Sequence, residues 1–483
     1  MSGWGTINLA AGCVYTLTAV NNNTDGPNGL PSVSGPLTIN GNGATIRRSA
    51  AGGTPDFRIF HLAAGGTLVL NDLTVQNGDP GSASSGGAIY SAGTLTLTDC
   101  TVKDSGTAYA GGGIYAVSSL SLTRCTVQDC AANYGGGGIE HRTAGTLTLT
   151  DCTVKGNLSA YGSGVYLNGQ TGTFTRCTFD SNGHVMWCAF GGGVYATGTL
   201  TAYNCTFSGN LADKGGGANV DGTVKLNNCT ITDNTAGSVG EGGGLYRNSG
   251  TLTVKNSIVA DNTPDNGAGT ITSSGYNLES GTDCGFTSTG DLQSTSPGIG
   301  SLLDNGSYTH THALRAGSAA IGAGTSTDID GAAITEDQRG VARPQLPSSS
   351  SYDIGAYEYT PAAIAWGAQS PLVSETAREW SYWSDGAAGS PTFQYGSSWG
   401  RIKLETTEVG HSDVIDTGNT KSKTITVSTD RYGTGVGLGT IYIRGQAASF
   451  TQDAASPSWE EYTTPATKTW RWIQVKLEGP ANA

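Results

Sequence analysis

Charged residues are scarce in this chain: Asp, Glu, Lys and Arg make up 13% of its 483 residues, about half the share found in a typical soluble domain. Methionine occurs only twice, and strong helix formers are sparse, which excludes a helical bundle, a coiled coil and a β-α-β enzyme. Glycine, by contrast, occurs 75 times, about twice its average usage. The composition therefore predicts a long all-β chain rich in Gly, Thr, Ser and Asn.

Basic residues are outnumbered, with 25 Lys and Arg against 38 Asp and Glu and a net charge of −13. Nucleic-acid binders usually show a basic footprint, so we expect no nucleic-acid partner. No apolar run approaches the ~18 residues of a membrane span, so we expect none. Residues 1–9 lack the basic and apolar regions of an export signal. Because the chain starts abruptly at a predicted strand, we expect that a leader was removed.

Two alternating motifs repeat through the first part of the chain. The unit GTLTLTDCTV at residues 93–102 recurs with variations, and the second motif is Gly-Gly-x-Ile-Tyr. Such self-similarity at a fixed period is typical of solenoids. The marker position of the first motif recurs every 24 to 28 residues, at Cys100, Cys125, Cys152, Cys177, Cys205, Cys229 and Ser257, after Ala44 and Leu73 in the same row.

Each repeat contains three short pieces with period-two alternation, such as Leu95–Leu97 and Cys100–Val102. A coil of this length with three short strands predicts a parallel β-helix whose coils stack about 4.8 Å apart, with the right-handed winding usual for parallel crossovers. The Cys row and an aliphatic row are expected to point inward. A row of Asn residues is expected to form a turn, because Asn tolerates left-handed φ and its amide can bond the next coil. The aliphatic row comprises Ile89, Ile114, Ile139, Val165, Val194, Ala218 and Leu245, and the Asn row Asn157, Asn182, Asn210, Asn234 and Asn262.

These units resemble the right-handed parallel β-helix repeat proteins of the pectin-lyase-like class. They are most similar to bacterial surface proteins of the polymorphic outer membrane protein or choice-of-anchor type. The likeness covers about residues 5–360 and implies extracellular or cell-surface display in a bacterium, with no agreed catalytic residues. It is carried by GTINLAAGCVYTLT (5–18), GPLTINGNGATI (35–46), GYNL (275–278), THTHAL (309–314), GSAAIGAG (317–324), DQRGVARP (337–344) and DIGAYE (353–358).

The composition changes after Thr360-Pro361, where seven of the nine Trp residues lie. Alternating runs at 423–430, 439–445 and 470–478 predict strands of a β-sandwich, vaguely similar to jelly-roll carbohydrate-binding modules. The sequence thus predicts an all-β chain of three parts. These are a parallel β-helix over 1–274, a closing or capping module over 275–360, and a Trp-rich, jelly-roll-like β-sandwich over 361–483.

One row of aromatic residues follows the inward aliphatic row by one position, so we expect it to face solvent. Flat aromatic faces at regular intervals suit pyranose rings, and they equally suit simple self-stacking. An insertion at 184–190 carries the only Trp within the regular coils, so a binding loop and a packing lid both remain open there. The glycan-binding candidates are Tyr90, Tyr115, Glu140, Tyr166, Tyr195, Tyr246 and Trp187, and Asn219 also interrupts the row.

Enzymes share this fold class, so the acidic residues matter. Asp99, Arg124, Asp151 and Arg176 occupy one corner on successive coils, and their alternating signs indicate a salt-bridged ladder rather than a calcium cluster. The tripeptide Arg401-Ile-Lys403 matches one motif of the polygalacturonases, and the match extends no further. We therefore nominate no catalytic residue. No CxxC pair occurs, so no zinc site is expected. Calcium stays possible but unsupported, and no cofactor is expected.

Together these features predict an extracellular bacterial surface protein, adhesin-like or structural, that binds polysaccharide or cell-surface glycan through exposed aromatic residues. One alternative is a polysaccharide lyase or glycoside hydrolase of the pectin-lyase-like fold. Another is a structural protein that forms a fibre or a spike, because solenoid ends invite self-association.

Overall fold

The computed structural model describes residues 5–81, 84–183, 189–344 and 352–360, without the side chains of 238 and 239. Beyond them it describes the backbone of eleven strands, β36 to β46. The chain divides into two compact units. The first comprises residues 1–344 and 350–358, and the second comprises residues 345–349 and 359–483. Within the described residues, no helix is long and apolar enough to cross a membrane.

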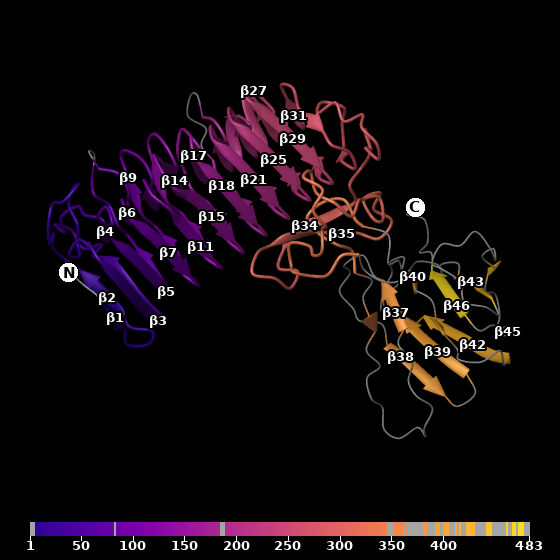
Figure 1. Cartoon of the computed structure of the whole chain (residues 1–483). Helices are drawn as coiled ribbons and strands as arrows, with labels where there is room; N and C mark the ends of the chain where they lie inside the picture. Colours follow the sequence, from indigo (N-terminus) through magenta and orange to yellow (C-terminus); the bar gives the residue numbers. More distant parts are fainter. Residues whose placement is uncertain are drawn as a thin grey trace. The chain divides into compact units, whose positions relative to one another are not determined.

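The first unit is a parallel β-helix, as the repeats predict (Figure 1). One side of every coil contributes a short strand to a nine-stranded sheet, and neighbouring strands pair in parallel. In chain order these strands are β4 (Phe60–Leu62), β6 (Ile89–Ser91), β10 (Ile114–Ala116), β14 (Ile139–Arg142), β17 (Val165–Asn168), β20 (Val194–Ala196), β24 (Ala218–Val220), β28 (Leu245–Arg247) and β31 (Gly267–Ala268).

The other two sides of each coil form a 20-stranded sheet. Its first strands are β1 (Gly5–Asn8), β2 (Val14–Leu17), β3 (Pro36–Arg48), β5 (Thr67–Gln76), β7 (Thr94–Thr98), β8 (Thr101–Lys103), β11 (Leu120–Thr123), β12 (Thr126–Gln128), β15 (Thr146–Thr150) and β16 (Thr153–Lys155). The others are β18 (Thr171–Thr175), β19 (Thr178–Asp180), β21 (Thr199–Tyr203), β22 (Thr206–Ser208), β25 (Thr223–Asn227), β26 (Thr230–Thr232), β29 (Thr251–Lys255), β30 (Ile258–Ala260), β32 (Thr272–Ser273) and β33 (Leu278–Glu279).

Short strands add two small parallel sheets beside the coils and one antiparallel pair after them. They are β9 (Gly106–Thr107) with β13 (Ala131–Ala132), β23 (Leu211–Lys214) with β27 (Thr235–Glu241), and β34 (Ile299–Leu303) with β35 (Thr311–Leu314).

Left-handed residues mark the corner before the Cys row and the Gly-rich bend of the coils. The residue before the Cys row has positive φ in coil after coil, for example 55° at Asp99 and 51° at Arg124. At the Gly-rich bend, Gly111 has φ of 66°, and a Cβ on Gly112 would lie 2.4 Å from the carbonyl oxygens of Ala131 and Gly137. Only glycine fits such a contact, which explains the repeated Gly-Gly-Gly run.

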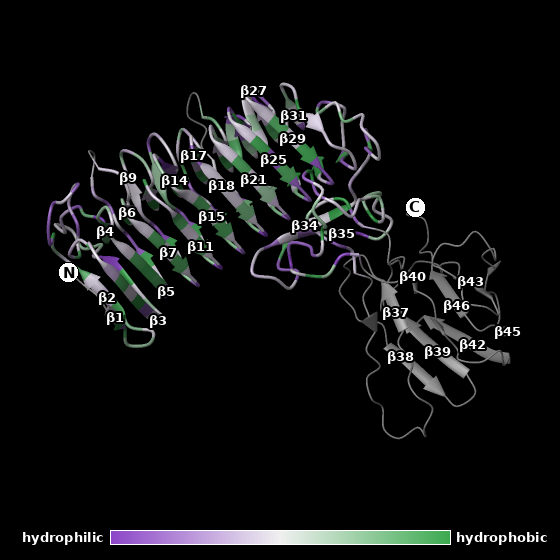
Figure 2. Cartoon of the chain, viewed as in Figure 1, coloured by the Kyte–Doolittle hydropathy of each residue, from purple (hydrophilic) through white to green (hydrophobic). Residues whose placement is uncertain are grey.

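The core fills the inside of the coils with aliphatic ladders, which Figure 2 shows as hydrophobic stripes across the strands. The Cys row is buried as predicted, and Cys100 N–H donates to Cys125 Sγ at 3.4 Å. Two further cysteines, Cys13 and Cys130, also belong to rows. Cys13 precedes Val14, the partner of Thr45, and so starts the Cys row, while Cys130 starts the Asn row.

The Asn row is a buried amide ladder rather than a left-handed turn. The residue before each Asn takes the positive φ, as at Gly156 and Ser181. The Asn side chains point inward instead, and Asn182 Nδ2 donates to Asn210 Oδ1 at 3.0 Å and to Val154 O at 2.8 Å. The expected bond between coils is therefore present, whereas the expected backbone role of Asn was wrong.

The part predicted to close the helix has two roles. Its Cys284 and Phe286, together with Ile271 just before it, join the core and plug the end of the last coils. Residues 299–344 and 352–358, named the return segment here, then run back along the outer face of the 20-stranded sheet. Its hydrogen bonds begin at Arg176, three coils before Ser257. Its Tyr308 ring reaches further back, to the guanidinium of Arg124 at 5.5 Å.

The second unit contains a seven-stranded and a four-stranded sheet. The first holds β36 (Ala363–Ile364), β37 (Trp380–Trp383), β40 (His411–Ser412), β41 (Ile415–Asp416), β43 (Ile441–Gln446), β44 (Glu460–Glu461) and β46 (Trp472–Leu477). The second holds β38 (Thr392–Gly396), β39 (Trp399–Leu404), β42 (Ser422–Thr429) and β45 (Ala466–Thr469). The jelly-roll-like sandwich and its Trp side chains lie outside the described residues and stay predictions.

Candidate functional site

The predicted aromatic row forms along one face of the nine-stranded sheet, and we call it the outward row. Tyr90 pairs with Tyr115, and Tyr115 pairs with Glu140. The register places its members at equal positions on successive strands. They are His61, Tyr90, Tyr115, Glu140, Tyr166, Tyr195, Asn219 and Tyr246.

The expectation that the outward row faces solvent was wrong for several of its members. Tyr115 and Tyr246 are each only 9% exposed, and Glu140 is 2% exposed. Asn219 and His61 are fully buried, while Tyr90, Tyr166 and Tyr195 are half-buried. The Gly-rich bend covers the row, since a Cβ on Gly135 would lie 2.6 Å from Glu140 Oε2 and 2.8 Å from Tyr166 Cδ1.

The rings of the outward row stack on one another in two runs. His61, Tyr90 and Tyr115 have centroids 5.3 and 5.5 Å apart, with tilts below 20°. Tyr166 and Tyr195 stack at 4.9 Å and 12°. Such offset stacks stabilise the sheet beyond their burial. Self-stacking, one of the two interpretations left open by the sequence, is therefore present.

Glu140 separates the two runs and carries a buried carboxylate. Its Oε1 lies 3.6 Å from Arg142 Nη1 and 3.5 Å from Asn168 Nδ2, while its Oε2 has no hydrogen-bond partner. Burial raises the pKa of Glu140, and the nearby Arg142 guanidinium only partly opposes this shift. Glu140 is therefore a covered group between two aromatic stacks rather than an exposed contact.

Basic side chains lie against both ends of the outward row. Arg58 is fully buried, with its Cζ 5.1 Å from the Tyr90 ring, and burial lowers its pKa to about 10. His61 Nε2 lies 3.0 Å from Asp25 Oδ2, and its Nδ1 lies 2.9 Å from Ser32 Oγ. At the far end, Lys214 Nζ lies 4.7 Å above the Tyr246 ring. The Arg58–Tyr90 and Lys214–Tyr246 contacts both have cation–π geometry.

The more exposed aromatic side chains lie on the bend itself. Tyr109 and Tyr134 are 49% and 59% exposed, and their rings are 5.7 Å apart. Tyr161 and Phe190 follow on the next two coils, with their ring centroids 5.7 Å apart and an interplanar angle of 6°. Tyr195 lies behind them, 6.0 Å from Tyr161. We call Tyr109, Tyr134, Tyr161 and Phe190 the bend aromatics.

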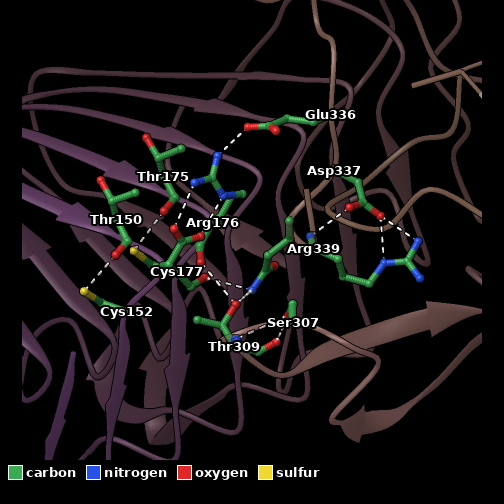
Figure 3. Close-up of polar contacts among 12 residues, drawn as sticks. Thr150, Cys152, Thr175, Arg176, Cys177, Ser307, Thr309, Glu336, Asp337 and Arg339 are labelled. Carbon is green, nitrogen blue, oxygen red and sulfur yellow. Dashed lines mark hydrogen bonds and ion pairs between the residues drawn. The ribbon is translucent and has the colours of Figure 1, made fainter. Parts of the chain in front are cut away.

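The acidic corner is a row of ion pairs, as predicted. Arg124 donates to both Asp99 oxygens at 2.6 and 2.7 Å, and Arg176 donates to both Asp151 oxygens at 2.7 and 2.9 Å. Arg176 also contacts Glu336 of the return segment (Figure 3). The paired guanidinium lowers the pKa of Asp99. Among the described residues, no group of three or more His, Cys, Asp or Glu side chains is placed to hold a metal ion.

The return segment was not predicted, and it buries one stretch of the outer face. Gln338 Nε2 donates to Thr178 Oγ1 at 2.8 Å and to Thr309 Oγ1 at 3.0 Å, and its Oε1 accepts from Thr206 Oγ1 at 2.6 Å. Figure 3 shows Thr309 of this segment beside Cys177 and Arg176, and Arg339 paired with Asp337. His312 is buried between Gly300 O at 2.7 Å and Ser208 Oγ at 3.0 Å.

The sequence carries a signal for the contact between the return segment and the outer face of the coils. The outward residue three positions after the Cys row is Lys103, Gln128 and Lys155 in early coils, but Ser208, Thr232 and Ala260 in later ones. The early side chains are half-buried and the later ones buried. Loss of long polar side chains at a fixed repeat position thus marks the covered face.

Trp187, the remaining candidate of the sequence analysis, lies outside the described residues, in the gap at 184–188. Ala189 and Phe190 follow this gap, and Ala189 N donates to Asp213 Oδ2 at 3.0 Å. The insertion therefore returns to the coils directly beside the bend aromatics.

Comparison with known proteins identifies the fold family. The sequence profile of the family described as right handed beta helix region matches residues 13–160 and 113–283, which together cover more than half of the chain. No curated protein and no solved structure matches significantly. The coils described above and this match agree in fold and extent. The chain therefore belongs to the right-handed β-helix family.

Proposed function

We propose that this protein is an extracellular bacterial surface protein, adhesin-like, whose β-helix binds glycan chains along the bend aromatics. The single observation that carries the proposal is the exposure of Tyr109 and Tyr134, at 49% and 59%. A monomeric protein gains nothing in stability by leaving two neighbouring aromatic rings in water, so such exposure points to a binding surface.

The repeat supports an extended ligand rather than a small one. The bend aromatics lie on successive coils, so their rings recur along the helix axis at about 4.8 Å per coil. A polysaccharide that runs along the axis would then meet several rings in sequence. Tyr166 and Tyr195 fix Tyr161 from behind, at 6.3 and 6.0 Å between ring centroids. A rigid ring loses little conformational entropy on binding.

The charge of the chain favours a neutral glycan. The net charge is −13, and Asp213 and Glu241 lie near the far end of the bend aromatics. Polyanionic chains such as polyuronates would be repelled at low ionic strength. The ligand class proposed is therefore an uncharged polysaccharide or cell-surface glycan.

A glycan array with the full chain tests this function. The variant Tyr109→Ala with Tyr134→Ala is expected to lose roughly tenfold or more in affinity, at about 1 kcal/mol or more for each aromatic anchor. Tyr308→Ala is the matched control, since Tyr308 is 71% exposed on the return segment. Unchanged binding by the double variant would refute the assignment to the bend. Release of reducing or unsaturated ends would favour the enzyme alternative.

A further inference from the structure

Strand β4 and the segment before it hold a serine, a histidine and an aspartate in one hydrogen-bonded line. We call Ser32, His61 and Asp25 the polar triad. His61 Nδ1 lies 2.9 Å from Ser32 Oγ, and His61 Nε2 lies 3.0 Å from Asp25 Oδ2. A hydroxyl within about 2.6–3.2 Å of a base that a third group orients is the arrangement of nucleophilic catalysis. Such a set is recognised by geometry and not by the order of its members along the chain.

The chemistry of the three groups determines where the protons of the polar triad lie. A carboxylate only accepts hydrogen bonds, so the proton between Asp25 and His61 lies on Nε2. His61 Nδ1 then carries a lone pair and accepts the hydroxyl proton of Ser32. Asn22 Oδ1 also lies 3.1 Å from Ser32 Oγ, but it already accepts from Asn28 Nδ2 at 2.7 Å. The Ser32 hydroxyl is therefore oriented toward the imidazole.

The surroundings of His61 keep its imidazole neutral and fixed. The ring is fully buried, and it stacks on Tyr90 with the ring centroids 5.3 Å apart. Burial lowers the pKa of His61, the hydrogen bond to Asp25 opposes this shift, and the nearby charge of Arg58 adds to it. A neutral imidazole held in one orientation can take a proton from Ser32 at neutral pH.

Buried side chains position the loop that carries Asp25. Arg58 Nη2 donates to Asp25 O at 3.0 Å, and Arg58 Nη1 donates to Asn28 Oδ1 at 2.9 Å. Both Arg58 and Asn28 are fully buried. The position of Ser32 is set by the neighbouring coil, because Val33 N donates to His61 O at 2.9 Å. Hydrogen bonds of the backbone therefore hold both partners of His61 in place.

The polar triad can be reached from solvent. Ser32 is half-buried, and the side chain of Asp25 is 56% exposed. A second contact between a serine and a histidine differs in both respects. His312 Nε2 lies 3.0 Å from Ser208 Oγ, but both residues are buried, and His312 Nδ1 contacts Gly300 O instead of a carboxylate. The Ser208 contact is therefore structural, whereas the polar triad combines an accessible hydroxyl with a base that a carboxylate orients.

We propose that the polar triad hydrolyses carboxylic esters, with Ser32 as nucleophile, His61 as base and Asp25 as the residue that positions the base. This activity is separate from the glycan binding proposed above. An ester is the fitting class of substrate, because its alcohol leaves with a single proton that His61 can supply. Cleavage of a glycosidic bond requires two carboxylates instead.

The reaction proceeds in two steps. Ser32 Oγ attacks the carbonyl carbon while its proton passes to His61 Nδ1, and the bond to the alcohol oxygen breaks as His61 returns that proton to the departing alcohol. Water then attacks the acyl group on Ser32, and its proton passes through His61 to Ser32 Oγ as the carboxylic acid leaves. The sum is ester and water to acid and alcohol.

A fluorophosphonate probe, which bonds covalently to activated serines, tests the proposal on the full chain. Mass spectrometry of the peptides should find the probe on Ser32 and not on Ser208, and the chain should hydrolyse p-nitrophenyl acetate. A positioned base contributes about 10²–10⁴-fold, so Ser32→Ala should lose roughly 100-fold or more of this turnover. Ser34→Ala, at an exposed position two residues away, is the matched control and should keep it. A chain without label on Ser32, or equal turnover in the two variants, would overturn the proposal.

The role of Asp25 has a readout that a structural contact would not change. Asp25→Asn places an amide donor against His61 Nε2, which favours the tautomer whose Nδ1 carries the proton and cannot accept from Ser32. Labelling of Ser32 should then fall roughly 100-fold or more while the far-UV circular dichroism stays unchanged. In the unmodified chain the labelling rate should rise with pH, with its midpoint below the ordinary pKa of histidine. Unchanged labelling of Asp25→Asn would contradict the triad, whatever the glycan array shows.

Discussion

The buried Asn ladder gives the sharpest test of what holds the coils in register. In Asn210→Ala, four hydrogen bonds disappear. Asn210 Nδ2 donates to Phe179 O and to Asn234 Oδ1, both at 2.9 Å, and its Oδ1 accepts from Asn182 N and Nδ2, both at 3.0 Å. Asn210 is fully buried, so water does not replace these partners. At about 1–3 kcal/mol for each buried group left unpaired, the free energy of unfolding should fall by about 3–5 kcal/mol.

A second Asn ladder provides the control, because it makes similar bonds at the surface. Asn40 Nδ2 donates to Asn8 Oδ1 at 2.8 Å, and Asn40 Oδ1 accepts from Asn71 Nδ2 at 3.0 Å. Water can take over these bonds, so Asn40→Ala should cost less than about 1 kcal/mol.

Urea unfolding followed by far-UV circular dichroism measures both costs, and comparison is valid where the m-values agree. Equal losses in the two variants would refute the reasoning, because burial is the property that separates the ladders. A small loss in both would mean that aliphatic packing alone fixes the register.

Three other predictions concern protonation and the return segment. Burial raises the pKa of Cys130 to about 12, so thiol reagents at pH about 9 should modify Cys13 in the native chain and leave Cys130 intact, as mass spectrometry of the peptides would show. Burial raises the pKa of Glu140 above 4.5, so native protein holds a proton that the unfolded chain releases, and stability should fall as pH rises from about 4.5 through the raised pKa. Glu140→Gln should flatten this fall in urea midpoints, and an unchanged slope would contradict it. Gln338→Ala removes the five hydrogen bonds of a buried side chain, should cost about 2–4 kcal/mol, and should speed proteolysis within 299–344, whereas Gln128→Ala should not.

The repeat period accounts for most of what was predictable in the fold. Marker residues such as Cys100 and Cys125 fix the coil length, and alternation along Leu95–Leu97 fixes which side chains point inward. These features depend on local periodicity and backbone sterics, which are properties of the sequence itself. Parallel pairing in register follows once the coils stack.

The candidate site was less predictable, because its exposure depends on segments that alternation does not describe. Tyr115 was correctly placed outward, but the Gly-rich bend of its own coil covers it. Glu140 is covered in the same way by Gly135. The return segment reaches Thr178 from more than a hundred residues away, and only the change from Lys103 to Ser208 at one repeat position signals it.

The return segment also makes the number of coils matter. Gln338 bridges the coils of Thr178 and Thr206, and Ala356 N donates to Thr230 Oγ1 at 3.1 Å. The return segment therefore forms hydrogen bonds with three neighbouring coils at fixed positions. A duplicated or deleted coil within this stretch would shift every such contact by one repeat. Coils before that of Arg124, whose guanidinium lies 5.5 Å from the Tyr308 ring, make no contact with the return segment among the described residues. Gain and loss of repeats between related genes should therefore concentrate in the N-terminal coils, where the β-helix can change length without disturbing its contacts with the return segment.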